Sequence, residues 1–194
     1  MTFARDNAWQ LPIAINFLDP WYRACGWQVE RYVGDHPMQR AHVDVAIRQG
    51  PWVHLIDEKI GRGRRDGRRA EKASIETWSC SVAGLERVGW MMDARNQATV
   101  VFFCFADTAD LAPDAWQRIK RMDCLWVPFR PLRTWFCQQD ENCWELQDNQ
   151  QVNRSLSRKV PIDQIASNVP GVRRYDPFGR WFNGTHRQLK PEPW

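Results

Sequence analysis

Two strand-forming runs, separated by a short turn-like segment, constrain the fold of this chain more than any other feature. The runs are VDVAI (43–47) and WVHLIDEKI (52–60), and the segment RQGP (48–51) lies between them. Strand-forming residues on both sides of a short segment that contains Gly and Pro are typical of a β-hairpin. We therefore expect two antiparallel strands, with the charged residues of one strand facing those of the other.

Further apolar runs predict the remaining strands. TVVFFCFA (99–106) is apolar enough to be buried on both faces of a sheet. ASIETWS (73–79) precedes it, and we expect this run beside 52–60, so that three antiparallel strands lead into the central one. CLWVPFRPL (124–132) is apolar, but its two prolines allow at best an edge strand. Shorter strands are expected in CWELQ (143–147) and SRKVPI (157–162).

Several segments predict helices. The apolar segment 7–18 leads into Asp19 and Pro20, which fit an N-cap followed by a first-turn proline, and Gly26 is suited to end that helix. Further helices are expected in PDAWQRIKRM (113–122) and PIDQIA (161–166).

Length and composition predict one α/β domain at 1–170 and an irregular, basic and aromatic arm at 171–194. A chain of 194 residues, 43% of them hydrophobic, can bury one sizeable core. Eighteen apolar residues never run together, and the first ten residues lack the order of a secretory signal. We therefore expect a soluble, cytoplasmic protein with no membrane partner.

Cysteine and tryptophan residues favour packing roles. The six cysteines form no CxxC pair and mostly lie in apolar runs, so we expect buried free thiols rather than structural zinc. The chain has 12 tryptophans, which can stack on unpaired bases. Trp52, Trp90, Trp126 and Trp144 lie in apolar or alternating segments, where core packing is the favoured interpretation.

A basic run follows the second strand. KIGRGRRDGRRAEK (59–72) holds seven basic and two acidic residues, although the net charge of the chain is only +4. Such a run favours polyanions, because it neutralises phosphates and releases counterions; the alternative is a solvated surface loop. The candidate nucleic-acid contacts are Arg62, Arg64, Arg65, Arg68, Arg69 and Lys72.

The charged residues of the hairpin form a candidate site. Side chains alternate along a strand, so Asp57 and Lys59 share one face while Glu58 lies on the other. A bulge in this strand would select Glu58 in place of Asp57. In a hairpin that closes near Gly50, Asp44 lies opposite the end of the second strand, close to Asp57.

A third carboxylate completes the candidate site. Glu76 can reach it if the strand at 73–79 pairs beside the strand that carries Asp57. Carboxylates this close repel one another unless a cation joins them, and hard oxygen ligands suit Mg²⁺ or Mn²⁺. The alternative is an exposed hairpin with a cross-strand Lys-Asp pair and an unrelated Glu76.

The spacing of these residues resembles a nuclease signature. Asp44, a gap of a dozen residues and then DEK (57–59) are similar to the D…(D/E)xK pattern of the PD-(D/E)XK nuclease superfamily. More narrowly, QRAHVDVAI, HLIDEKI and IETWS resemble small phage and prophage proteins of this type. The resemblance covers residues 35–106. Two features differ from the pattern: no proline precedes Asp44, and His42 stands where glycine is favoured.

The resemblance implies both a fold and a set of site residues. The fold would be a restriction-endonuclease-like α/β (α+β) domain, a mixed β-sheet flanked by helices. Asp44, Asp57 and Glu76 would be the metal ligands and Lys59 the catalytic lysine, while Gln39 matches an upstream glutamine of the pattern.

We therefore expect a Mg²⁺- or Mn²⁺-dependent nuclease that acts on DNA, with RNA as the alternative substrate. Two other functions stay open: a catalytically inactive relative that only binds nucleic acid, and a phage or prophage factor that binds a protein partner through a Trp-rich surface. No GxxxxGK[ST], GxSxG or HExxH motif is present, so P-loop, serine-esterase and zincin chemistry have no support. The oligomeric state is left open.

Overall fold

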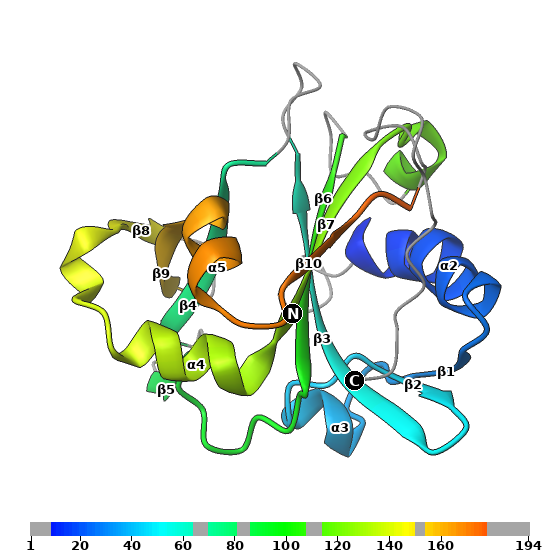
Figure 1. Ribbon diagram of the computed structural model, residues 1–194, viewed down its shortest axis with the longest axis horizontal. Coiled ribbons are helices and arrows are strands. Elements are labelled where there is room, and N and C mark those ends of the chain that lie inside the picture. Colours follow the sequence, from blue (N-terminus) through cyan, green and yellow to red (C-terminus); the bar gives the residue numbers. More distant parts are fainter. Residues whose placement is uncertain (1–8, 64–69, 81–85, 108–113, 150–153, 178–194) are drawn as a thin grey trace.

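Two β-sheets make up the framework of the protein (Figure 1). The computed structural model describes residues 9–63, 70–80, 86–107, 114–149 and 154–177. The six-stranded sheet consists, in spatial order, of β1 (Gln28–Arg31), β2 (Val45–Gln49), β3 (Trp52–Arg62), β6 (Val100–Ala106), β7 (Met122–Pro128) and β10 (Arg173–Tyr175). The four-stranded antiparallel sheet consists of β5 (Glu86–Val88), β4 (Lys72–Cys80), β9 (Arg154–Pro161) and β8 (Glu145–Asn149).

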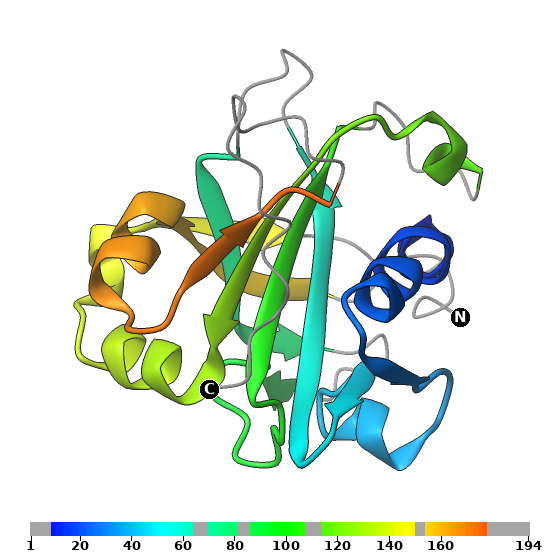
Figure 2. The same ribbon diagram turned by 45° about the vertical axis from the view of Figure 1, so that its right-hand side comes forward.

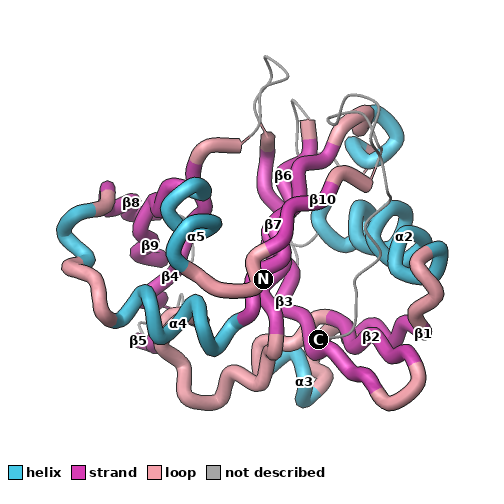
Figure 3. The backbone as a smooth tube through the Cα atoms, viewed as in Figure 1, coloured by secondary structure: helices cyan, strands magenta, loops and turns pink. Residues whose placement is uncertain are grey.

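The helical segments are short and lie outside the sheets (Figure 3). They are η1 (Ala14–Leu18), α2 (Asp19–Ala24), α3 (Pro37–Arg40), η2 (Ala115–Arg118), α4 (Phe129–Cys137), η3 (Glu141–Cys143) and α5 (Ile162–Asn168). Among the residues that the structure describes, none of these helices has the length and apolar character needed to cross a membrane. The expected mixed α/β class is confirmed.

Three layers enclose two separate parts of the core (Figure 2). One face of the six-stranded sheet packs against the helical segment η1–α2, and the other face packs against the four-stranded sheet with α4 and α5. Side chains point alternately to the two faces of the sheet along β6, so Phe102 packs in the core cluster on the helical side and Phe103 in the cluster on the other side. Helices therefore cover one face of the mixed sheet by themselves, and a second sheet together with α4 and α5 covers the other.

The predicted hairpin is confirmed. Strands β2 and β3 pair antiparallel, with Val45 opposite Ile56 and Gln49 opposite Trp52. Gly50 in the turn has a φ of 57°, a left-handed conformation that glycine adopts without steric cost. Strand β6 lies parallel to β3 and is buried along nearly its whole length, as its apolar sequence predicts.

The expected pairing of the strand at 73–79 is wrong. This segment forms β4, which pairs with β5 and β9 in the second sheet and not with β3. The free edge of β3 is occupied by β6 in a parallel arrangement, and parallel strands need a long crossover connection. Strands β4 and β5 belong to that crossover, and they leave the first sheet to cover its face.

The interpretation of 124–132 as at best an edge strand is also wrong. Strand β7 is buried and lies between β6 and β10. Its prolines do not interrupt the ladder, because Pro128 is the last residue of the strand and Pro131 lies in the first turn of α4. The sheet edge is β10, which lies within the segment expected to be an irregular arm; residues 178–194 lie outside the described part.

Two helix expectations need correction, whereas α5 agrees with the helix expected near 161–166. Asp19 is not an N-cap, since Leu18 before it is already helical and the chain runs from η1 directly into α2. In the described part of the segment 113–122, residues 114–122, the only helical element is the 3-10 turn η2, and Met122 already belongs to β7.

A buried ion cluster joins α2, β1 and β3 on the helical side of the sheet. Arg31 donates from Nη1 to Glu58 Oε2 at 2.7 Å and from Nε to Asp19 Oδ1 at 3.0 Å. Tyr22 donates its hydroxyl to Glu58 Oε1 at 3.0 Å. Burial raises the pKa of Glu58, although Arg31 opposes that shift. One guanidinium thus compensates two buried carboxylates.

We expect Arg31→Met to destabilise the protein by about 3–5 kcal/mol, because it leaves Asp19 and Glu58 buried without a cation. The measurement is the free energy of unfolding in urea. The matched control is Arg48→Met, which removes an exposed pair with Glu30 at 3.4 Å and should cost only about 0–1 kcal/mol. Equal losses in the two variants would show that the buried cluster does not stabilise the fold.

Candidate functional site

The hairpin and strand β4 bring the four predicted site residues together. Lys59 Nζ forms an ion pair with Asp57 Oδ1 at 2.7 Å. Lys59 also interacts electrostatically with Asp44, which directly precedes β2, and with Glu76 on β4. On the face of β3 that is turned away from the helical layer, one ammonium group thus pairs with Asp57 and lies within electrostatic range of two further carboxylates.

Asp44 is held by hydrogen bonds to both of its carboxylate oxygens. The backbone N–H of Glu58 donates to Asp44 Oδ2 at 2.7 Å, and Gln39 Nε2 donates to Asp44 Oδ1 at 2.9 Å. Its backbone is fixed as well, because Asp44 N donates to Ile56 O at 2.8 Å. The side chain of Asp44 is therefore tied to the strand that carries Asp57 and Lys59.

Asp57 is almost fully buried and incompletely hydrogen-bonded. Its side chain faces Lys59, but Oδ2 has no hydrogen-bond partner among the described residues. Burial raises the pKa of Asp57 to about 7; Lys59 opposes this shift and the neighbouring Asp44 carboxylate adds to it. A buried carboxylate oxygen without a donor is costly unless a proton or a cation satisfies it.

Lys59 keeps its charge in this setting. Burial lowers its pKa, but Asp57, Asp44 and Glu76 together raise it above the ordinary value. The ammonium nitrogen also lies 4.9 Å from the centre of the Trp90 ring, a cation–π contact. The side chain thus carries a fixed positive charge on the acidic face of β3.

Glu76 reaches the site through an irregularity in β4. The register against β9 shifts between Glu76 and Trp78, and such a bulge re-aims the side chains around it. The turn at 89–91 packs against this point: Met91 N donates to Glu76 O at 3.3 Å, and the Trp90 backbone hydrogen-bonds to the Glu76 carboxylate. Burial raises the pKa of Glu76, while Lys59 and this hydrogen bond lower it.

Gly89 permits this close approach. A Cβ atom at position 89 would lie 2.4 Å from Glu76 O, which is too short for any side chain. Trp90, the next residue, contacts both Glu76 through its backbone and Lys59 through its ring. The GW pair therefore links the second sheet to the site, and this connection was not foreseen from the sequence.

Glu58 does not belong to the acidic face. Strand β3 has a regular register against β6 from Ile56 to Arg62, so no bulge brings Glu58 to the side of Asp57. Its carboxylate lies instead in the buried cluster with Arg31 and Tyr22. The alternation expected for this strand holds in the structure.

A further polar cluster beside the site was also not foreseen. His42 Nε2 lies 3.0 Å from Asp93 Oδ2, and Arg95 Nη2 donates to the same oxygen at 2.7 Å. The hydrogen bonds from Arg95 hold the pKa of Asp93 well below its usual range. Burial lowers the pKa of His42, and Lys59 lowers it further. One hint was present in the sequence, since His42 stands where the resembled pattern favours glycine. In the structure His42 has a φ of 56°, a conformation that glycine adopts without strain.

The basic residues are only partly within the described structure. Arg62 is exposed at the end of β3, and Lys72 begins β4, where it pairs with Glu145 at 3.0 Å. The other four loop arginines lie outside the described residues: Arg64, Arg65, Arg68 and Arg69.

The carboxylates are not arranged as a formed metal-ligand set. Within the described ranges, no group of three or more His, Cys, Asp or Glu side chains has a geometry that could hold a metal ion. In this arrangement the Lys59 ammonium occupies the position beside Asp57 Oδ1. The expectation of a metal site therefore stays a prediction.

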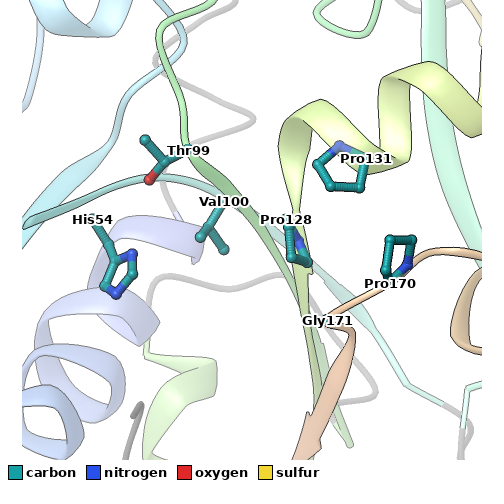
Figure 4. A pocket seen from close by; sticks show the side chains of 7 residues that line it. All are labelled: His54, Thr99, Val100, Pro128, Pro131, Pro170 and Gly171. Carbon is teal, nitrogen blue, oxygen red and sulfur yellow. The ribbon is translucent and has the colours of Figure 1, made fainter. Parts of the chain in front are cut away.

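A pocket of about 370 Å³ lies apart from these residues. Its lining includes His54, Val100 and Pro128 and none of the charged site residues (Figure 4). His54 is buried between the rings of Trp27 and Trp126, both with centroids at 5.2 Å, and burial lowers its pKa to about 4. The lining is mainly apolar and contains no carboxylate, lysine or arginine.

Comparison with protein-family models, curated proteins and solved structures finds no significant match to this chain. The geometry and the sequence pattern are therefore the basis for assigning a function.

The stability of the metal-free protein should decrease as the pH rises through the pKa of Asp57. An unfolded Asp has a pKa of about 3.9, whereas Asp57 in the folded protein has a pKa of about 7. Between these values the folded state binds more protons than the unfolded chain, so stability present below about pH 4 is lost as the pH approaches 7.

Urea unfolding in EDTA, at several pH values between about 4 and 9, measures this effect. Other buried carboxyls also titrate, so the test is the difference in free energy of unfolding between the wild type and Asp57→Asn at each pH. The difference should change across the interval from about pH 4 to 7 and be flat above it. Parallel profiles for the two proteins would contradict the raised pKa.

Proposed function

We propose that this protein is a divalent-metal-dependent nuclease that hydrolyses phosphodiester bonds of DNA. The observation that carries the proposal is the convergence of Asp44, Asp57 and Glu76 around the ammonium of Lys59. The resemblance of the D…DEK pattern to PD-(D/E)XK nucleases supports it, and so does the mixed sheet that contains the hairpin. A restriction-endonuclease-like fold belongs to the same proposal.

The residues present fit a hard divalent cation. Asp57 Oδ2 is buried without a hydrogen-bond donor in the described structure. Each carboxylate oxygen of Asp44 accepts one hydrogen bond and keeps a further lone pair for a cation. Oxygen ligands of this type suit Mg²⁺ or Mn²⁺. Asp44, Asp57 and Glu76 would hold the ion. When bound, it supplies charge stabilisation for phosphoryl oxygens and a nucleophilic water.

Lys59 would act on the phosphate directly. Its ammonium stays protonated, and it lies at the acidic face with one donor engaged by Asp57. An ammonium has three donors, so the others are available to a phosphate oxygen or to the attacking water. Stabilising the negative charge that develops during hydrolysis is the largest contribution such a group can make.

Basic side chains near the end of β3 support a nucleic-acid substrate. The exposed Arg62 aligns with Ala106, and Asp107 N donates to Arg121 O at 3.1 Å, so Arg62 and the exposed Arg121 lie at the same end of the sheet. Lys59 and Arg62 belong to the basic run 59–72, of which residues 64–69 lie outside the described structure. Cations placed here can hold phosphates on either side of the bond to be cut. DNA is the proposed substrate and RNA the alternative.

The main rival is a non-catalytic protein that binds nucleic acid. The absence of a formed metal-ligand set among the described residues favours it. A second rival is a factor that binds a protein partner, which is favoured by the exposure of Trp52 and Val53 on the hairpin, 42% and 41%. Trp52 was expected in the core, whereas Trp90, Trp126 and Trp144 are buried there.

Cleavage of supercoiled plasmid, linear DNA and RNA with Mg²⁺ or Mn²⁺ tests the proposal. We expect cleavage of DNA that EDTA abolishes, and a loss of rate of roughly 10²-fold or more for Lys59→Ala and for Asp57→Ala. The matched control is Arg48→Ala, which removes an exposed cation elsewhere on the hairpin and should keep the wild-type rate.

Activity that survives both site substitutions would contradict the catalytic assignment. Binding without cleavage, with an affinity that falls steeply as salt rises, would favour the non-catalytic nucleic-acid binder. The absence of both binding and cleavage would leave the protein-partner alternative.

A further inference from the structure

We propose that Gln39 is a positioning residue, whose side-chain amide holds Asp44 in the orientation required of a metal ligand. This inference rests on the proposed function, since it concerns the same site. Gln39 does not touch Asp57, Lys59 or Glu76 in any hydrogen bond of the described structure, so it would act only through Asp44.

The side-chain nitrogen of Gln39 links Asp44 to the backbone around it. Gln39 Nε2 donates to Asp44 Oδ1 at 2.9 Å and to Tyr32 O at 2.8 Å. Tyr32 N in turn donates to Asp44 O at 2.8 Å. An amide nitrogen has two protons, so one can hold the carboxylate while the other holds the carbonyl of Tyr32, the residue directly after β1.

Helix α3 places Gln39 for this contact. His36 caps the helix, since its Nδ1 accepts a hydrogen bond from Met38 N at 3.2 Å, and Pro37 occupies the first helical position. Three residues after Gln39 the chain turns back, with His42 in a left-handed conformation, and Asp44 then leads into the hairpin. Gln39 and Asp44 thus face each other across one tight turn.

A second donor holds the opposite oxygen of Asp44. The N–H of Glu58 donates to Oδ2 at 2.7 Å, and Glu58 is itself locked by Arg31 on the other side of the sheet. With one donor on each oxygen, rotation of the carboxylate group is restricted. Without Gln39, only Oδ2 is fixed and the carboxylate can turn about its last bond.

The expected consequence is a loss of metal affinity. Groups that orient a metal ligand through a hydrogen bond typically contribute 10- to 100-fold to metal affinity. Gln39 also bonds to a backbone carbonyl, so its loss will lower stability too. A test must therefore separate metal affinity from stability.

The test compares Gln39→Met with Tyr22→Phe. Methionine has nearly the size of glutamine and lacks the donor. Tyr22→Phe removes a hydrogen bond to Glu58 on the opposite face of β3, and each variant should lower Tm by about 2–4 °C. Mn²⁺ binding to the protein without nucleic acid is measured by titration calorimetry or by electron paramagnetic resonance.

We expect Gln39→Met to bind Mn²⁺ roughly 10- to 100-fold more weakly, Tyr22→Phe to bind it as the wild type does, and excess Mn²⁺ to restore the cleavage rate of Gln39→Met. Wild-type Mn²⁺ affinity in a folded Gln39→Met, or equal weakening in both variants, would overturn the role of Gln39 and leave the proposed function intact. A wild type that binds no Mn²⁺ and cleaves no nucleic acid would overturn the proposed function itself, and this inference with it.

Discussion

Charge is buried on both faces of strand β3, and this constraint determines the rest of the structure. On one face Glu58 is compensated by Arg31, which also holds Asp19 of α2. On the other face Asp57 is compensated by Lys59. Burying either carboxylate in its charged form without its partner is costly. The strand therefore favours the observed position of the helical layer on one side and of the acidic cluster on the other. The backbone N–H of Glu58 joins the two by binding Asp44.

The local part of this arrangement could be predicted from the sequence. The hairpin follows from two strand-forming runs around Gly50, and alternation within β3 separates Glu58 from Asp57 and Lys59. These are properties of neighbouring residues. The position of β4 could not be predicted in this way. It depends on β6 pairing with the free edge of β3, and β3 and β6 lie far apart in the chain. Strand β7 was expected at an edge because of its prolines, whereas in the structure the distant segment β10 covers it.

The sequence predicted that the residues of the candidate site lie together, but not which strands and turns bring them together. Glu76 meets Lys59 from a second sheet rather than from a neighbouring strand, and it does so through a shifted register that the Gly89-Trp90 turn supports. No period in the sequence identifies that turn as part of the site. The strained backbone of His42 and its bond to Asp93 likewise appear only in three dimensions. Such strain persists where the surrounding contacts fix it, and it is common at functional sites.

The most direct measurement of the central claim is a crystal structure of the protein with Mn²⁺, in which anomalous scattering locates the ion. We expect one strong peak bounded by the carboxylates of Asp44, Asp57 and Glu76, with the Lys59 ammonium displaced from Asp57 Oδ1. A structure without a peak there at saturating Mn²⁺, with Lys59 still bound to Asp57, would contradict it.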